Sequence, residues 1–354
     1  MTKVRDFLGP YRLARLIRMG NSCQVWEAIE TATGQRYALK VLREDFRERK
    51  DEIAFLKNEF EIAHGMSHPN VIKMHQLFLE KNLPPFLVLE LFSELNIKQA
   101  LRRGPDSIAF MLDKIAVQCT ESLYYMHSQG WVHCDIKPDN FLVSRDGEVK
   151  LIDFTISQKM KTGFAKWFAG KPKSIAGTRS YMSPEQIRGA ALDQRSDIYS
   201  FGCVLFELVT GKPPYTGSTP NELLSKHLSA PIPSPLVAND NVTQEYANVI
   251  RTAMAKKPQD RFESMWELLK TLRVTKIFKK QPRIPESSIF DDVPTAGRIH
   301  NQEQVSNVDG EKKPNSKDPK DPNDPKDKDP KDKDPKDKDP KDKDPKDKDP
   351  KQSK

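Results

Sequence analysis

Two aspartates, a lysine and an asparagine lie within one short stretch near the middle of the chain. Asp135, Lys137 and Asn140 occur in residues 133–140 (HCDIKPDN), and Asp153 follows in the run LIDFT. In phosphoryl transfer one aspartate orients the attacking hydroxyl group, while a lysine and metal-bound groups offset charge on the moving phosphoryl group. The residue types and their spacing therefore predict a phosphoryl-transfer site.

A short hairpin is predicted between these two groups of residues. Residues 141–143 and 149–152 are apolar runs of strand length, and a tight turn is expected at the Asp-Gly pair 146–147. Such a hairpin would bring the loop of Asp135 and the side chain of Asp153 to the same end of a two-stranded ribbon.

At these residues the chain resembles the protein kinase family. The pattern HxDxKxxN at 133–140 matches its catalytic loop, and DFT at 153–155 matches its magnesium motif with the last position changed. The lysine two residues after the first aspartate is similar to the Ser/Thr branch, most of all to the eukaryote-like Ser/Thr kinases of bacteria. Carried over position by position, the catalytic residues are Asp135 and Lys137, and the magnesium ligands are Asn140 and Asp153.

The same resemblance implies an ATP site. Lys40 ends the run YALK, which matches the family's third-strand motif, and it would bind the α- and β-phosphates while Glu59 holds it. The run LELF at 89–92 resembles the hinge, whose backbone would bond adenine, and three apolar side chains would enclose the ring. The implied ATP-binding residues are Gly20, Val25, Ala38, Lys40, Glu59, Glu90, Phe92 and Leu142.

The glycine-rich loop departs from the family pattern at two positions. In residues 18–25 (RMGNSCQV), Arg18 and Cys23 replace the outer two glycines, while Gly20 and Val25 remain. Glycine at these places lets the backbone approach phosphate and adopt a positive φ. Their loss predicts weaker ATP binding.

Two further departures lie close to the catalytic motifs. Cys134 replaces an arginine that in the family meets a phosphate on the activation segment, so phosphorylation there is expected to matter less. Thr155 replaces a glycine, and its β-branched side chain either holds Asp153 in one orientation or displaces it. These changes leave an alternative to a serine/threonine protein kinase, namely a pseudokinase or nucleotide-binding scaffold with weak or no catalysis.

Other matching positions have scaffold roles in the family. The activation segment, residues 153–185, contains Thr178, whose hydroxyl group is expected to bond the catalytic aspartate and lysine. The remaining expectations are an ion pair of Glu185 with Arg261, a catalytic loop held by Asp197, and His133 packed against Phe154.

The elements that must position these residues fall into two groups. The first part of the chain predicts an antiparallel sheet with one helix at 51–64, because its strands alternate as half-buried strands do. The strands are expected at 11–16, 24–29, 35–42, 71–79 and 85–91. After residue 93 helical periodicity dominates, with helices expected at 110–128, 193–210, 219–229, 244–256 and 263–272.

The predicted fold is therefore α+β and bilobal. It has a small antiparallel-sheet N-lobe with one helix, at about 11–92, and a larger helical C-lobe, at about 93–272. Residues 273–316 are expected to form a basic and polar linker. In residues 317–354, fourteen lysines and thirteen aspartates nearly cancel in charge. This Lys/Asp/Pro repeat has little to bury, so a disordered tail is predicted.

Composition limits the partners and the compartment. The net charge of +8 over 354 residues is moderate, and no nucleic-acid partner is expected. ATP, Mg²⁺ and proteins with serine or threonine hydroxyls are the partners that the resemblance implies. The four cysteines have neither zinc nor CxxC spacing, which indicates free thiols in a reducing compartment. Without a signal peptide or a membrane span, a cytoplasmic protein is predicted.

Overall fold

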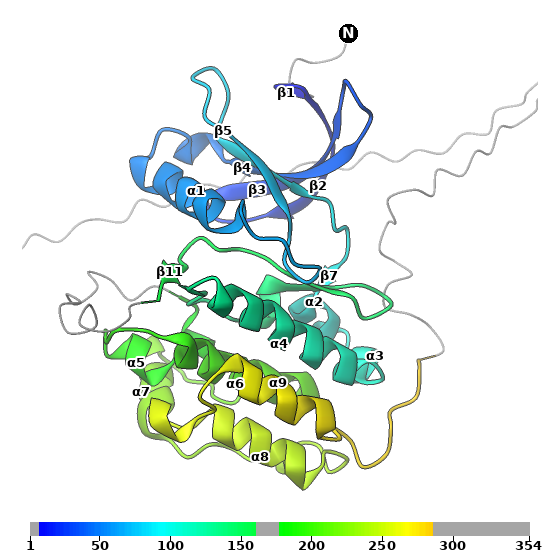
Figure 1. The fold of residues 1–354 in the computed structure, drawn as a ribbon, viewed down its shortest axis with the longest axis vertical. Coiled ribbons are helices and arrows are strands. Elements are labelled where there is room, and N and C mark those ends of the chain that lie inside the picture. Colours follow the sequence, from blue (N-terminus) through cyan, green and yellow to red (C-terminus); the bar gives the residue numbers. More distant parts are fainter. Residues whose placement is uncertain (1–6, 161–176, 286–354) are drawn as a thin grey trace, which may run out of the picture. The chain divides into compact units, whose positions relative to one another are not determined.

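The first half of the fold is an antiparallel sheet whose strands come from the N-terminal part of the chain. The computed structural model describes residues 7–160 and 177–285. The sheet order is β1-β2-β3-β4-β6-β5, and Figure 1 shows it as a curled layer. Its strands are β1 (Phe7–Leu8), β2 (Tyr11–Met19), β3 (Cys23–Glu30), β4 (Arg36–Leu42), β5 (Met74–Phe78) and β6 (Phe86–Glu90).

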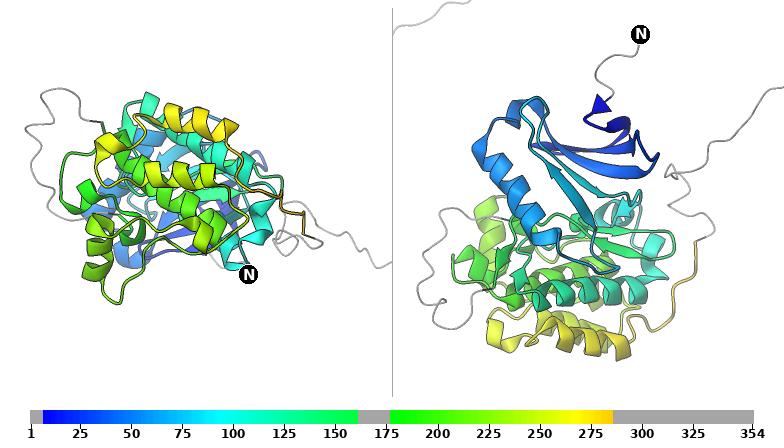
Figure 2. Two further views of the ribbon diagram at one scale, coloured as in Figure 1. Left: turned by 90° about the horizontal axis from the view of Figure 1, so that it is seen from below. Right: turned by 45° about the horizontal axis from the view of Figure 1, so that its top comes forward.

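One helix, α1 (Lys50–Ala63), covers one face of this sheet (Figure 2). Its buried residues Leu56, Ile62 and Ala63 join a core with Met74 and Leu87 of the sheet. Burying these apolar side chains, at about 25 cal/mol per Å² of apolar surface, is what attaches the helix. The helix therefore presents one fixed face toward β5 and β6.

The second half of the fold is helical and surrounds a buried helix, α6 (Gln194–Thr210). Fourteen consecutive residues of α6, from Ser196 to Val209, are buried. At Gly202 an added Cβ would lie 2.8 Å from Met254 Cγ and 2.9 Å from Ala253 Cβ, so this glycine permits a close helix approach. The other helices are α2 (Ile97–Arg102), α3 (Asp106–Ala109), α4 (Leu112–Ser128), α5 (Pro184–Ile187), α7 (Pro220–Ser229), α8 (Gln244–Ala253) and α9 (Met265–Val274).

Short elements connect the two halves and carry the motifs. Strands β9 (Phe141–Val143) and β10 (Val149–Leu151) pair antiparallel, which confirms the predicted hairpin, and β7 (Leu95–Asn96) joins β9. Strand β8 (Trp131–Val132) pairs with β11 (Gln158–Lys159). The 3₁₀ turns lie at Glu44–Phe46, Pro138–Asn140, Arg179–Tyr181, Pro235–Val237 and Pro258–Asp260.

Several predicted boundaries differ from the structure. The helix expected from residue 110 begins at Leu112, and the strand expected at 71–79 shrinks to Met74–Phe78. At the start of that strand Val71 instead makes a parallel bridge to Leu151 in the other lobe. Helices α2 and α3 were not predicted because they are too short to show a helical period.

The segment after α9 packs onto the helical half. Ile277 and Phe278 are buried, Phe278 makes an isolated bridge to Val242, and Lys279 N–H donates to Asn241 O at 2.7 Å. The linker predicted from residue 273 therefore begins with an ordered stretch. Ile277 and Phe278 are flanked by lysines in the sequence, so no apolar pattern marks this stretch as buried. The rest of the linker and the repeat tail, from residue 286, lie outside the described residues.

Among the residues that the structure describes, no helix has both the length and the apolar character needed to cross a membrane.

Candidate active site

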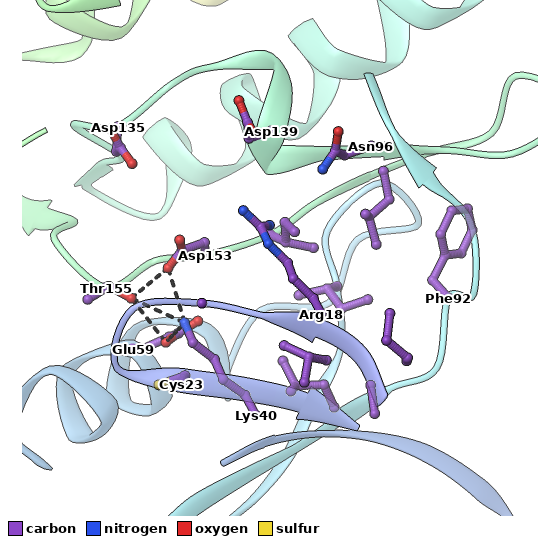
Figure 3. A pocket seen from close by; sticks show the side chains of 18 of the residues that line it. Arg18, Cys23, Lys40, Glu59, Phe92, Asn96, Asp135, Asp139, Asp153 and Thr155 are labelled. Atoms are coloured by element: carbon purple, nitrogen blue, oxygen red, sulfur yellow. Dashed lines mark hydrogen bonds and ion pairs between the residues drawn. The ribbon is translucent and has the colours of Figure 1, made fainter. Parts of the chain in front are cut away.

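A cleft of about 830 Å³ lies between the sheet and the helical half (Figure 3). Side chains of the sheet form its roof, including Val25 and Ala38, and Leu142 and Ile152 lie on its floor. The predicted residues that line the cleft are Gly20, Val25, Ala38, Lys40, Glu59, Glu90, Phe92, Asp135, Leu142 and Asp153. Of the predicted site residues, Lys137 and Asn140 do not line it, but both contact Asp135.

Lys40 joins the two lobes at the inner end of the cleft. Its Nζ donates to Glu59 Oε2 at 2.6 Å and to Asp153 Oδ1 at 3.2 Å. Burial alone would lower the pKa of Lys40, but the two carboxylates outweigh burial and raise it well above its usual value. Burial also raises the pKa of Glu59, and Lys40 offsets only part of that effect. Lys40 is therefore a charged, fixed group.

The hydroxyl group of Thr155 lies inside this ionic cluster. Thr155 Oγ1 is 2.5 Å from Asp153 Oδ1 and 3.2 Å from Glu59 Oε2, and it accepts from Lys40 Nζ at 3.3 Å. Burial opposes ionisation of Asp153, but Lys40 and the Thr155 hydroxyl lower its pKa below the usual range. Asp153 has a φ of 68°, a strained value that these bonds help to hold. Of the two outcomes predicted for Thr155, the structure shows the one in which Asp153 is held.

Asp135 is held by contacts to both carboxylate oxygens. Oδ1 accepts from the Thr178 N–H at 2.7 Å, and Oδ2 accepts from Lys137 Nζ. Lys137 Nζ also donates to Thr178 Oγ1 at 2.9 Å, and Asn140 Nδ2 donates to Asp135 O at 2.8 Å. The Thr178 hydroxyl group thus bonds Lys137 as predicted. The predicted bond from this hydroxyl group to Asp135 is wrong, because the backbone N–H of Thr178 makes that bond.

Asp197 of α6 anchors the loop that carries Asp135. Its carboxylate accepts from the N–H groups of His133 at 2.8 Å and Cys134 at 2.9 Å, which confirms its predicted role. It also accepts from His127 Nε2 at 2.8 Å. Burial opposes ionisation of Asp197, but these donors lower its pKa. Nothing in the sequence marks His127 as a functional residue, because it is a single polar side chain near the end of a helix with an apolar face.

Two further scaffold predictions are confirmed. Arg261 Nη1 and Nη2 donate to Glu185 Oε1 at 2.7 Å and Oε2 at 2.9 Å, a bidentate pair in the helical core. The rings of His133 and Phe154 lie with their centroids 5.6 Å apart. The ion pair connects Glu185 of α5 to the loop before α9, and the ring contact joins the segment of Asp135 to the segment of Asp153.

Cys134 is buried in the loop. Its Sγ is 3.3 Å from Gln158 Nε2, and its carbonyl accepts from Gln186 Nε2 at 2.8 Å. Burial raises the pKa of the Cys134 thiol well above its usual value, so the thiol remains protonated. Residues 161–176 of the activation segment lie outside the described part of the chain.

Glu90 and Phe92, the residues predicted to bond adenine, both line the cleft. The N–H of Glu90 donates to Lys73 O at 2.8 Å, and its carboxylate binds Lys150 at 2.8 Å. The carbonyl of Phe92 accepts from Glu94 N–H at 3.0 Å. Within the described residues the N–H of Phe92 has no partner, so it can bond a ligand.

The oxygen donors of the site fit a hard cation that also binds phosphate. In the described ranges no group of three or more His, Cys, Asp or Glu side chains is arranged to hold a metal. A magnesium ion needs only one or two protein oxygens when phosphates and water complete its shell. Asp153 offers a carboxylate at the cleft surface, and the backbone carbonyl of Asn140 accepts from Ile152 N–H at 2.9 Å, which places the two motifs side by side.

Comparison with known proteins finds one family across most of the chain. The protein kinase domain family matches residues 11–272. Among curated relatives, a "Probable serine/threonine-protein kinase" of Streptomyces coelicolor is 30% identical over 271 residues, covering 76% of this chain and 40% of that protein. Serine/threonine-protein kinase PrkC of Bacillus subtilis is 32% identical over 257 residues, covering 72% of this chain and 39% of its own. Serine/threonine-protein kinase PknH of Mycobacterium tuberculosis is 31% identical over 267 residues, which cover 75% of this chain and 42% of that protein. The chain spans about two fifths of the length of these relatives.

Proposed function

Because the chain belongs to the protein kinase family, we propose that it transfers the γ-phosphoryl group of ATP to serine or threonine hydroxyls of proteins. The observation that carries this proposal is one cleft that joins two sets of groups. Lys40 with Glu59 and Asp153 forms the first set, and Asp135 with Lys137 forms the second. The names of the bacterial relatives favour serine and threonine as acceptors.

The nucleotide is proposed to lie across the cleft with its base toward the hinge. Val25 and Ala38 would cover one face of adenine and Leu142 the other, since all three side chains line the same cavity. The N–H of Phe92, which has no partner among the described residues, would donate to the base, and the backbone carbonyl of Glu90 would accept from it. Lys40, kept charged by its carboxylates, would then contact the α- and β-phosphates.

Asp135 and Lys137 are proposed to act on the acceptor and the moving group. Asp135 would orient the substrate hydroxyl and accept its proton, while Lys137 would offset charge on the γ-phosphate. Thr178 supports both, because its amide holds Asp135 and its hydroxyl holds Lys137. Little covalent work falls to the protein, so fixed position and charge supply most of the rate.

Asp153 and Asn140 are proposed to hold Mg²⁺. When bound, this ion neutralises charge on the phosphates of the nucleotide. The Thr155 hydroxyl and Lys40 keep the Asp153 carboxylate ionised and in place for that role.

A transfer assay with radiolabelled ATP and Mg²⁺ tests the proposal. Wild-type protein is expected to label itself or a mixture of serine- and threonine-containing peptides. Asp135→Asn should reduce the rate by about 100-fold or more, since general base catalysis contributes about 10²–10⁴-fold. Its affinity for MgATP should stay within about twofold, because Asp135 acts on the hydroxyl group.

The matched control is Asp146→Asn, the same change in the exposed turn of the β9–β10 hairpin. It should leave both rate and affinity unaltered. Wild-type protein that binds MgATP but transfers no label to any acceptor would instead favour the nucleotide-binding scaffold.

A further inference from the structure

The strand register places Arg18 beside the nucleotide-facing residues of the sheet. Arg18 of β2 lies directly opposite Val25 of β3, and Val25 lies directly opposite Lys40 of β4. Directly opposite residues of an antiparallel sheet share a face, and neighbouring strands are about 4.8 Å apart. Arg18, Val25 and Lys40 therefore form one row across the cleft roof, and all three line the cavity.

Arg18 is a cation without a counter-ion in the described part of the chain. It is exposed and has no hydrogen bond or ion pair among those residues. Lys40, by contrast, already shares its charge with Glu59 and Asp153. Figure 3 shows the Arg18 side chain extending into the cleft on the side of Asp153 and Asp139.

The backbone of the neighbouring loop is occupied by its own contacts. Gly20 N–H donates to Cys23 O at 2.8 Å, and Arg43 binds the carbonyls of Asn21 and Ser22, each at 2.8 Å. Of these contacts, the one at Gly20 withdraws a backbone amide from a phosphate, and the two from Arg43 fix the path of the loop. Among the residues that line the cleft, acidic side chains outnumber basic ones. A polyanion in this cleft therefore needs an unpaired cation from the protein.

We propose that Arg18 binds the phosphates of the nucleotide and so replaces the glycine backbone contacts that this loop lacks. The guanidinium group carries five N–H donors and suits two phosphate oxygens at once. This inference rests on the proposed function, because it assumes that the cleft holds a nucleoside triphosphate. It assigns Arg18 a role in binding and differs from the expectation that loss of this glycine weakens ATP binding.

Direct binding measurements on the full chain test this role. Dissociation constants for MgATP, MgADP and adenosine are measured by calorimetry for wild type, Arg18→Gln, Arg18→Lys and Arg18→Gly. Arg18→Gln should weaken MgATP and MgADP by about tenfold, equivalent to about 1.4 kcal/mol. Adenosine, which has no phosphate, should bind all four proteins alike. Arg18→Lys should retain part of the affinity, since a point charge replaces the planar fork.

The control is Arg12→Gln, which removes the same charge from β2 at an exposed position that does not line the cleft. It should bind MgATP like the wild type, and melting temperatures should agree among all variants. Equal losses for adenosine and MgATP, or unchanged MgATP binding in Arg18→Gln, would overturn the assignment.

Tighter MgATP binding by Arg18→Gly would also overturn it, because it would mean that the arginine obstructs the cleft. Each of these outcomes leaves the proposed kinase activity standing. Wild-type protein that binds no MgATP would overturn the proposed function, and this inference with it.

Discussion

Thr155 shows how a single hydroxyl group can complete an ionic cluster. Glu59 and Asp153 both face Lys40, so two negative charges share one cation. Thr155 Oγ1 lies between the two carboxylates and can donate to only one of them at a time. A glycine, which the family pattern has here, would leave these carboxylates without that donor.

Thr155→Val is expected to impair transfer while preserving the fold. The variant keeps the β-branched shape and loses the hydroxyl group, so Asp153 loses a donor to its ionised form. The maximal rate should fall about tenfold, a barrier increase of about 1.4 kcal/mol. The Mg²⁺ concentration for half-maximal rate should rise, as steady-state assays at varied Mg²⁺ would show.

Thr155→Ser is the matched control, because it restores the hydroxyl group without the methyl group. It should recover the rate to within about threefold of wild type. If serine and valine impair transfer equally, the methyl group and not the hydroxyl group is what matters at this position.

At the scale of elements, buried charges connect the helices to the loops that carry the site. Asp197 in α6 binds the amides of His133 and Cys134, and Glu185 in α5 binds Arg261. The side chain of Arg261 is 0% exposed and that of Glu185 10%. Removal of one partner would leave the other charge buried and unpaired, which commonly costs about 3–5 kcal/mol.

Glu185→Gln should therefore destabilise the protein in a pH-dependent way. Burial alone would raise the pKa of Glu185, but Arg261 lowers it below its usual value. Because the pKa of Glu185 is lower in the folded state, its ionisation stabilises the fold at pH values above the pKa of the unfolded state, about 4.3. This stabilisation is lost as the pH falls through the pKa of the folded state. Urea unfolding at pH 7 should show a loss of about 3 kcal/mol in Glu185→Gln.

The difference in unfolding free energy between wild type and Glu185→Gln should stay constant above about pH 5 and become smaller as the pH falls below about 4. Glu245→Gln, the same substitution at an exposed position, is the control, and its unfolding free energy should be close to that of wild type at any pH. A gap that widens toward acid would contradict the ion-pair assignment.

For the whole molecule, the packed domain extends past its last helix. Ile277 and Phe278 are buried against the helical half, and α9 ends at Val274. Two chain lengths test where the stabilising contacts stop. A chain that ends at Val274 should lose about 3 kcal/mol or more of unfolding free energy, because burial of each such side chain contributes about 1.5–3 kcal/mol.

A chain that ends at Gly310 is the companion to this truncation. It retains both apolar residues and removes the Lys/Asp/Pro repeat, whose composition has nothing to bury. Its melting temperature and transfer rate should equal those of the full chain. A melting temperature several degrees lower would show that the repeat packs on the domain.

The sequence by itself determined the order of the motifs and the local elements that carry them. The β9–β10 hairpin is correctly predicted because its strands and turn are neighbours in sequence, so turn chemistry alone sets their pairing. The α+β division follows in the same way from a change of hydrophobic period between the two halves. Side-chain types then indicated which residues could do chemistry.

Only the tertiary structure decided how residues distant in sequence meet. His127 contacts Asp197, 70 residues away in sequence, and Thr155 contacts Lys40, 115 residues away. A local sequence pattern carries no information about contacts at such separations. The row that contains Arg18 depends on register shifts within β2, since a slip of one residue moves a side chain to the opposite face of the sheet. Packing against the rest of the fold selects that register, so the charge over the cleft becomes visible only once the sheet is assembled.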